Sequence, residues 1–148
     1  MEQWWRVAKG NRLNQLNCRI DVFVDQDHSV YVLDNDNHRV MKRVRGSKEG
    51  TVLVGDRGYG NALTQLSNPQ GVFVYPLGTA FLANWGYHRV MGWCSGGIEG
   101  NVIVGGNGRG QQANQLNSPV GLSFDRHGNF YVADLGNHRV QRFTIEAS

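Results

Sequence analysis

Three histidines are the residues best suited to chemistry in this sequence, because each stands in the same local motif. The tripeptide His-Arg-Val occurs three times, at intervals of 50 residues (88 − 38 and 138 − 88), and begins at His38, His88 and His138. An acid or an amide precedes each histidine by four residues, at Asp34, Asn84 and Asp134. Imidazole and carboxylate groups bind zinc and act as general acids and bases, so a metal site shared by three units is one hypothesis.

The repetition favours a structural role for this motif over a metal site. A polar residue that recurs in every unit most simply serves what every unit needs. We expect the carboxylates of Asp34 and Asp134 to accept hydrogen bonds from loop N–H groups and to pair with the arginines five residues later. Asn84 keeps the acceptor without the charge. We predict no metal and no cofactor, and a structural motif made of Asp34, His38, Arg39, Asn84, His88, Arg89, Asp134, His138 and Arg139.

The other candidate sites lack parts that their chemistry needs. Segments 25–27 and 34–37 begin like calcium loops, but no bidentate acid follows in register. The glycine-rich segment 105–110 has no Lys-Ser/Thr and no long helix after it, which argues against a phosphate loop. No Gly-x-Ser-x-Gly motif occurs. We therefore predict no catalytic residues and expect that the chain is not an enzyme.

The internal repeat extends beyond the histidine motif, because the chain consists of one unit of 50 residues that occurs three times. Glycines recur at 10, 60 and 110, and Gln-Leu pairs recur at 15–16, 65–66 and 115–116. A fixed period of roughly 20–50 residues is typical of solenoids, propellers and arrays. We place the repeats at about 11–60, 61–110 and 111–148, with residues 1–10 as a leftover outer strand.

Each unit contains four strand candidates, which in the second unit are 71–75, 80–83, 88–93 and 101–105. They are rich in β-branched and aromatic residues and are separated by turn residues. A tight hairpin joins the first two strands, and a positive φ is expected there at His28, Gly78 and Gly128. A long loop follows the fourth strand, and its Gln-Leu pair predicts a buried leucine in each unit, namely Leu16, Leu66 and Leu116.

Four antiparallel strands followed by one longer connection describe a propeller blade. The predicted fold is all-β, a β-propeller of three four-stranded blades that forms a partial ring or half of a six-bladed ring. A parallel β-helix is the alternative, but its coils are usually much shorter. The sequence has no helical periodicity, which argues against helical repeats. Period-two alternation assigns to the core Val22, Val24, Tyr31, Phe73, Phe81 and Tyr131.

The sequence resembles the NHL-repeat family over essentially its whole length after the first ten residues. The resemblance rests on Asn-His-Arg-Val at 37–40 and 137–140, on Tyr-Val-x-Asp before each, and on Asn-Ser-Pro-x-Gly at 117–121. It implies a β-propeller, commonly six-bladed. The second unit departs from the pattern with Asn84 and Tyr87. The first unit has Arg19 and Asp21 where the others have Pro and Gly, so we expect an irregular start to its first strand.

The resemblance leaves three functions open. The preferred one is a non-catalytic protein-binding scaffold, including a substrate-recruiting part of a ubiquitin-ligase-type protein, although no ligase domain is present in the sequence. The alternative is an RNA-binding propeller with a basic face, to which the basic run 42–48 could contribute. The third, a metal-dependent propeller lyase or hydrolase, lacks a ligand set here.

We expect the binding face to lie where the long loops and the turns between second and third strands emerge together. We call this end of the blades the loop face. Positions that vary between units within a fixed frame are freer to serve a ligand, and Trp, Tyr and Arg are enriched at binding hot spots. The residues predicted to bind are Arg57, Tyr59, Trp85, Tyr87 and Arg109. For Trp85, packing against a neighbouring blade is the competing interpretation.

Three units do not make a ring, since propellers have typically 4 to 8 blades. Residues 3–7 occupy an outer-strand position with no unit before it, and the third unit stops at its third strand. Two arrangements are open: a head-to-tail homodimer, or a fragment of a longer chain.

The composition excludes a membrane protein. The net charge is +3, no apolar run approaches the roughly 20 residues of a membrane span, and residues 1–6 lack the apolar region of a signal peptide. Cys18 and Cys94 occupy different positions in the repeat, which favours a reducing compartment. We expect a soluble, cytoplasmic protein without membrane association.

Overall fold

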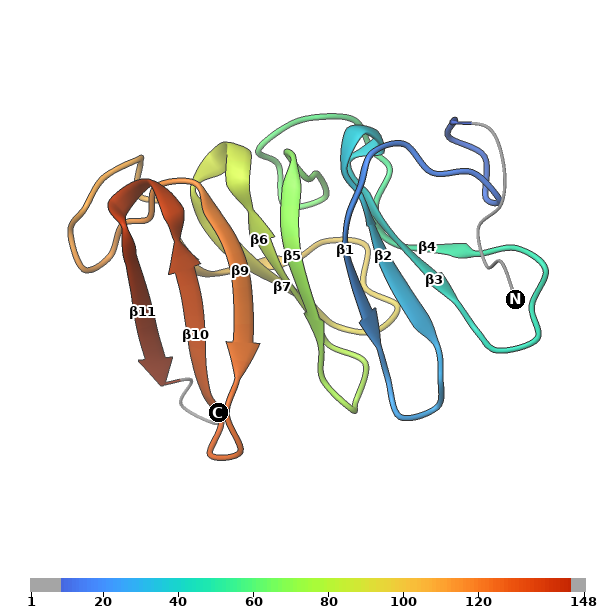
Figure 1. Ribbon diagram of the computed structural model, residues 1–148. Helices are drawn as coiled ribbons and strands as arrows, with labels where there is room; N and C mark the ends of the chain where they lie inside the picture. The colour runs from blue at the N-terminus through green and yellow to red at the C-terminus, as the bar shows by residue number, and fades with distance from the viewer. Residues whose placement is uncertain (1–8, 145–148) are drawn as a thin grey trace.

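A computed structural model describes residues 9–144 as three antiparallel sheets standing in a row (Figure 1). The first sheet contains β1 (Arg19–Val24), β2 (Val30–Asp34), β3 (Arg39–Arg43) and β4 (Thr51–Gly55). The second contains β5 (Pro69–Val74), β6 (Ala80–Asn84), β7 (Arg89–Trp93) and β8 (Asn101–Gly105). The third contains β9 (Pro119–Phe124), β10 (Asn129–Asp134) and β11 (Arg139–Thr144). The predicted all-β propeller fold is confirmed as a partial ring.

The sheets are built as blades, each with its strands in sequence order. The prediction of four strands holds for the first two sheets, whereas the third has three within residues 9–144. The outer strand predicted at residues 3–7 lies outside the described residues. Single turns of 3-10 helix, the only helical elements in the described part of the chain, join the second and third strands of the blades: η1 (Asn35–Asn37), η2 (Trp85–Tyr87) and η3 (Leu135–Asn137). None of the described residues forms a helix able to span a membrane.

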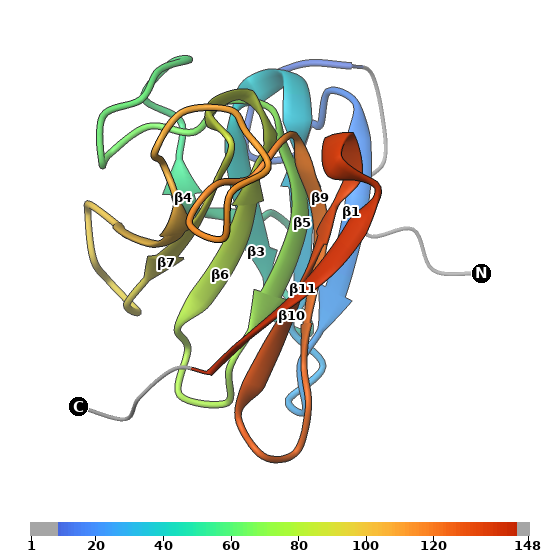
Figure 2. The ribbon, with the colours of Figure 1, turned by 90° about the vertical axis from the view of Figure 1, so that its left-hand side faces the viewer.

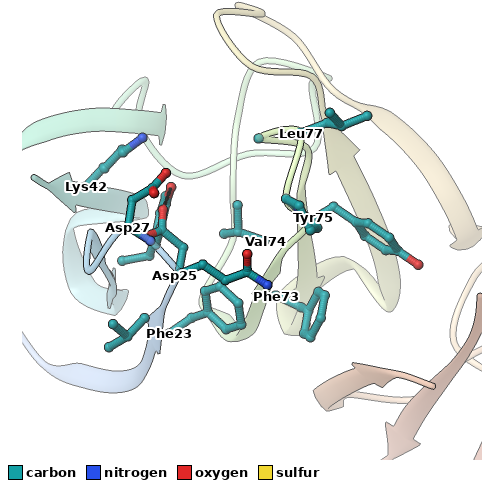
Figure 3. A pocket seen from close by; sticks show the side chains of 13 residues that line it. Phe23, Asp25, Asp27, Lys42, Phe73, Val74, Tyr75 and Leu77 are labelled. Atoms are coloured by element: carbon teal, nitrogen blue, oxygen red, sulfur yellow. Dashed lines mark hydrogen bonds between the residues drawn. The ribbon is translucent and has the colours of Figure 1, made fainter. Parts of the chain in front are cut away.

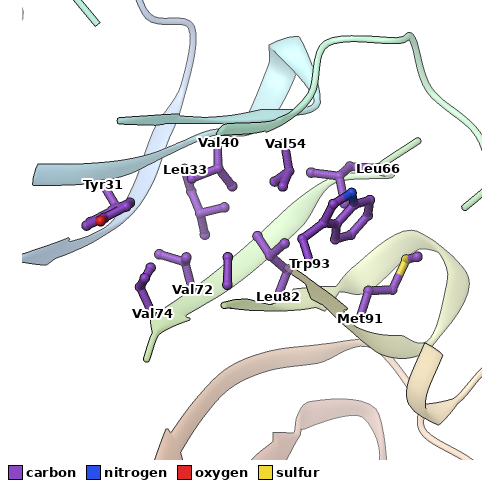
Figure 4. Close-up of a cluster of buried hydrophobic side chains, with 11 residues drawn as sticks. Tyr31, Leu33, Val40, Val54, Leu66, Val72, Val74, Leu82, Met91 and Trp93 are labelled. Carbon is purple, nitrogen blue, oxygen red and sulfur yellow. The ribbon is translucent and has the colours of Figure 1, made fainter. Parts of the chain in front are cut away.

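The core lies between neighbouring sheets, which pack face to face (Figures 1 and 2). Between the first and second sheets, Leu33 and Val40 meet Leu82 and Trp93 in one cluster, and all four are 0–1% exposed (Figure 4). A second cluster joins the second and third sheets and contains Val90, Leu116, Phe130 and Val132. These two clusters are buried because one sheet stands beside the next. A third cluster, Leu16, Val32 and Met41, belongs to the first blade alone and is closed by the leucine of its own long loop.

The predicted core is correct except at the start of the row. Tyr31 and Phe81 are buried, and Phe73 and Tyr131 are half-buried. Val22 and Val24 are 59% and 53% exposed, so their assignment to the core was wrong. Phe23 contacts Phe73 of the second sheet, and strand alternation turns Val22 and Val24 to the opposite face, on which no further blade packs within residues 9–144.

The long loops drop one leucine each into the core, as predicted. Leu16, Leu66 and Leu116 are at most 7% exposed. The loop closes on itself through a hydrogen bond from the Gly60 N–H to the Leu66 carbonyl, and through the equivalent bond from Gly110 to Leu116. A side chain at position 60 would displace the Gln65 carboxamide, which donates from its Nε2 to the Arg57 carbonyl at 3.0 Å, so glycine leaves room for this bond.

The hairpins and strand starts repeat closely. His28 has a φ of 62°, against 89° at Gly78 and 83° at Gly128, as predicted for this position. The irregular start expected for the first strand of unit one is present, but the other two units share it. Each first strand has a register shift after its first residue, and each is preceded by a residue with positive φ, namely Cys18, Asn68 and Ser118.

We predict that Leu66→Ala lowers the free energy of unfolding by about 2–5 kcal/mol, because it leaves a cavity in the core. Leu63 lies in the same loop but is 41% exposed. Leu63→Ala is the matched control and should cost less than about 0.5 kcal/mol. Urea unfolding followed by tryptophan fluorescence measures both. Equal losses would show that the loop does not anchor through Leu66.

Candidate ligand-binding face

The first blade closes its η1 turn on a buried carboxylate. Asp34 is 0% exposed and accepts hydrogen bonds from the Arg39 Nε at 2.7 Å, the Asn37 Nδ2 at 2.8 Å and the Asn17 N–H. Arg39 is also fully buried. Because both charges are paired and hydrogen-bonded, the blade can bury them at the base of the turn.

The third blade repeats this arrangement. Asp134 accepts from the Asn117 N–H at 2.7 Å, the Asn137 Nδ2 at 2.8 Å and the Arg139 Nε at 2.8 Å. Burial by itself raises the pKa of Asp134, but these three donors outweigh it and hold the pKa below its usual range. The interactions expected of Asp34 and Asp134 are thus present in both outer blades.

The second blade has the arginine without the carboxylate. Asn84 accepts from the Ser67 N–H at 2.8 Å and supplies no charge. Arg89 is 6% exposed and donates from its terminal nitrogens to the carbonyls of Asn61 and Ala62. Its Nε has no hydrogen-bond partner among the described residues, and burial lowers the pKa of this guanidinium. The Tyr87 ring lies 5.7 Å from the Arg89 Cζ and takes the place of the amide found in the sister blades.

Two of the three repeat histidines, His38 and His88, join neighbouring blades. The Ser118 N–H donates to the His88 Nδ1 at 2.9 Å, and the Asn68 N–H donates to the His38 Nδ1 at 3.4 Å. Each histidine thus holds the start of the next blade. Burial lowers the pKa of both imidazoles, and Arg109 adds to the effect at His88. No three His, Cys, Asp or Glu side chains within residues 9–144 are placed to hold a metal ion.

The long loops and the 3-10 turns emerge at one end of the blades, at the top of Figure 1. On this loop face the rings of Tyr59 and Tyr87 lie 5.9 Å apart, and the His38 ring lies 5.3 Å from Tyr59. We call Tyr59, Tyr87, His38 and Arg89 the tyrosine cluster. It joins residues of two blades and of the loop between them, and its outermost member, Tyr59, is 54% exposed.

The remaining predicted residues lie in the turn and long loops of the same face: Trp85 in η2, Arg57 in the loop of Tyr59, and Arg109 in the next loop. Arg109 occupies in the next loop the place of Tyr59, as the matching bridges from Tyr59 to Leu66 and from Arg109 to Leu116 show. Arg57 and Arg109 are exposed. Trp85 is 38% exposed and makes no ring contact with another described aromatic residue. Sequence comparison missed His38 and Arg89 as members, because their motif is common to all units. The signal for Arg89 was the loss of its aspartate.

A hollow lies at the end of the blades opposite to the loop face, between the first two hairpins (Figure 3). It has a volume of about 380 Å³ and is lined by Phe23, Phe73, Tyr75 and Asp25, among others. Asp25 is engaged by the Ser29 N–H, the Asp27 N–H and the Tyr31 hydroxyl. The third hairpin repeats this pattern around Asp125, so the acid serves the hairpin.

The basic run 42–48 is also at that opposite end. It begins at the far end of β3 from His38, and Lys42 lines the hollow with its Nζ 5.2 Å from the centre of the Tyr31 ring. The run therefore does not extend the loop face.

Comparisons with known proteins support the fold. The model of the NHL repeat matches residues 116–143. No curated protein sequence matches the chain significantly. An auxiliary nutrient binding protein from Bacteroides thetaiotaomicron superposes with a TM-score of 0.66 at 13% identity, over 82% of this chain and 36% of the other. A putative phosphatase from the same organism gives 0.67 at 18% identity, over 86% and 35%.

A catalytically inactive virginiamycin B lyase from Staphylococcus aureus gives a TM-score of 0.58 at 7% identity, over 88% of this chain and 42% of the lyase. At these identities the likeness concerns the fold alone. This chain spans 35–42% of the length of the three structures.

We predict that the protein loses stability as the pH falls below about 6.5, the value for an unperturbed histidine. The folded pKa of His88 is lowered, so the unfolded chain takes up the proton first. The contribution of His88 is complete above the unfolded pKa and is lost as the pH falls through the folded one. His88→Asn keeps an acceptor near the Nδ1 position and tolerates the φ of 51°. It should flatten the decline in urea midpoint between neutral and mildly acidic pH.

The control for this prediction is His88→Ala, which has no acceptor at any pH. It should lower the free energy of unfolding by about 1–2 kcal/mol at neutral pH, through the lost hydrogen bond and the left-handed backbone. A His88→Asn variant with the full wild-type pH dependence would contradict the assignment.

Proposed function

We propose that this chain, a partial β-propeller with an NHL repeat at residues 116–143, is a non-catalytic interaction module that binds protein partners on its loop face. The contact surface is centred on the tyrosine cluster, with Trp85, Arg57 and Arg109 around it. The observation that carries the proposal is the difference of the second blade, where the arginine has no carboxylate partner among the described residues and lies against the half-buried Tyr87 ring, next to the exposed Tyr59.

The cluster has the features of a hot spot for an acidic segment. Tyr59 offers a rigid, exposed ring at little conformational cost, and Tyr is enriched at hot spots. Among the described residues, the Arg89 guanidinium has no counter-charge comparable with the 2.7–2.8 Å ion pairs of the sister blades. A carboxylate brought to the rim of Tyr87 would reduce this imbalance, and an apolar or aromatic neighbour in the same segment would cover Tyr59.

The proposed lack of catalysis rests on what the reactive side chains already do. Asp34 and Asp134 are held by an arginine, an asparagine and a backbone N–H, and His88 accepts a backbone hydrogen bond through its Nδ1. These groups stabilise blades and joints. Substrate recruitment for a ubiquitin ligase would use the same face, with the ligase chemistry supplied by another domain. The two free cysteines fit the reducing cytoplasm as the proposed compartment.

RNA binding is the second candidate, because the exposed Tyr59 ring is also suited to stacking on a base. The position of the basic run 42–48 weakens it. With that run at the opposite end of the blades, it cannot extend a phosphate-binding track from the exposed arginines Arg57 and Arg109 of the loop face.

Fluorescence anisotropy with two labelled probes tests the proposal. One probe is a peptide of alternating glutamate and tyrosine, and the other is a short single-stranded polyuridine RNA. We predict that the peptide binds. Tyr59→Ala should lower its affinity about tenfold or more, because it removes a hot-spot residue. Leu77→Ala is the control, since Leu77 is 91% exposed on the opposite hairpin. Strong, salt-sensitive binding of RNA with none of the peptide would replace the proposal by the RNA function.

We predict that Asn84→Asp has opposite effects on stability and on peptide binding. The variant places a carboxylate where the sister blades pair an aspartate with arginine. We expect it to raise the free energy of unfolding by about 1–3 kcal/mol. This gain is smaller than the roughly 3–5 kcal/mol lost when an existing buried pair is broken. Because the new carboxylate neutralises Arg89, the variant should also bind the acidic peptide severalfold more weakly. Asp134→Asn, the converse change in the third blade, should destabilise. An Asn84→Asp protein that binds the peptide more tightly would refute the role of the unpaired charge.

A further inference from the structure

The contact between neighbouring blades, here called a joint, occurs twice in the described residues and has the same features both times. In both joints, the histidine of one blade accepts a hydrogen bond from the backbone N–H thirty residues later, in the next blade: His38 from Asn68, and His88 from Ser118. In both, the valine after the His-Arg pair, Val40 or Val90, is 0% exposed. A blade face of this type is therefore completed by another blade.

The two ends of the row carry the unmatched halves of such a joint. At the first blade, Val22 and Val24 are 59% and 53% exposed, whereas the same positions in the second blade, Val72 and Val74, are 5% and 4% exposed. At the third blade, Val140 is 68% exposed, against 0% at Val90.

The histidine of the third blade fits the same description. His138 has the left-handed backbone of its sisters, with a φ of 54°, but its side chain is exposed and has no hydrogen-bond partner among the described residues. The residue that would meet it in a third joint stands at the position of Asn68 and Ser118. In this chain that position is Cys18, which shares their positive φ.

A glycine in the third blade points the same way. Gly71 in the second blade has no room for a side chain, because a Cβ would lie 2.8 Å from the Val120 carbonyl of the next blade. Gly121 holds the same position in the third blade, yet a Cβ there would meet only the Ala133 side chain of its own sheet, at 3.9 Å. Within the described residues nothing approaches Gly121 as Val120 approaches Gly71.

The outer edge of the third blade is also incomplete. Within residues 9–144, β11 pairs only with β10, and a groove of about 340 Å³ lies beside Phe143, between β8 and the loop 113–116. The counterpart of Phe143 in the second blade is Trp93, which is 1% exposed and shares its core cluster with Val54 and Leu66. The third blade thus has room for a partner both on its face and along its edge.

We propose that a second copy of this chain completes these faces, with the Val22–Val24 face of one copy against the Val140 and His138 face of the other. Applied twice, this head-to-tail contact closes a ring of six blades around a two-fold axis. Six is the only multiple of three within the roughly 4 to 8 blades of closed propellers. The proposal is independent of the ligand on the loop face.

Light scattering on the 148-residue chain tests the assembly. We expect a dimer of twice 16.5 kDa at tens of micromolar. Val140→Asp, a charge in the centre of the proposed joint, should give a monomer with unchanged circular dichroism, since the site is 68% exposed in the single chain. Leu77→Asp, on a hairpin outside the joint, should leave the dimer intact. A wild-type monomer, or an open series of larger species, overturns the ring.

Disulfide trapping tests the register of the joint. His138→Cys should form an intermolecular disulfide with the native Cys18 of the second copy, seen as a dimer on a non-reducing gel and abolished by Cys18→Ser. Cys94, which is exposed, is changed to Ser in every variant. The positive control is His88→Cys with Ser118→Cys and Cys18→Ser, which reports on the same contact within one chain, where the native atoms are 2.9 Å apart. If the control closes and the His138→Cys dimer does not form, the joint is refuted.

Discussion

The structure depends on one constraint: a blade buries most of its apolar surface only against the face of another blade. The strands within a sheet satisfy one another's backbone groups, but the side chains of Leu33, Val40, Leu82 and Trp93 leave water only because two sheets stand side by side. Equivalent valines pass from 4–5% exposed in the second blade to more than half exposed in the first. Stability is therefore set at the joints, and the outermost faces are the places where further contacts are to be sought.

The joints are specified by polar groups as well as by apolar packing. A histidine in a left-handed conformation reaches from each of the first two blades to the backbone of the next, at a position where that backbone also has positive φ. Such a bond has strict geometry, so it fixes the register of neighbouring blades in a way that interdigitating valines and leucines alone do not. Because the acceptor is an imidazole nitrogen, we expect the same device to weaken the joints in acid.

Within this repeated frame, the second blade differs from its sisters in how it holds the buried arginine. The outer blades neutralise a buried arginine with an aspartate and an asparagine, whereas the second blade leaves Arg89 with carbonyl partners and the face of Tyr87. Two substitutions, Asn84 and Tyr87, act together here, since the amide that served the carboxylate is replaced by a ring that covers the cation. A buried charge without a counter-charge is costly to the fold, which is why we propose that a ligand completes this site.

The sequence by itself determined the unit of the fold. The period of 50 residues, the Asp-to-Arg spacing and the Gln-Leu pair were sufficient to predict blades, ion pairs and buried leucines, because these are local features of each unit. Only the tertiary structure decided what depends on neighbouring units. Val22 and Val24 have the pattern of core residues and are exposed, since alternation selects a face of a strand but not whether that face is covered. The tyrosine cluster likewise draws His38, Tyr59 and Tyr87 from positions spread over 49 residues (87 − 38), and their meeting follows from how one blade is set against the next.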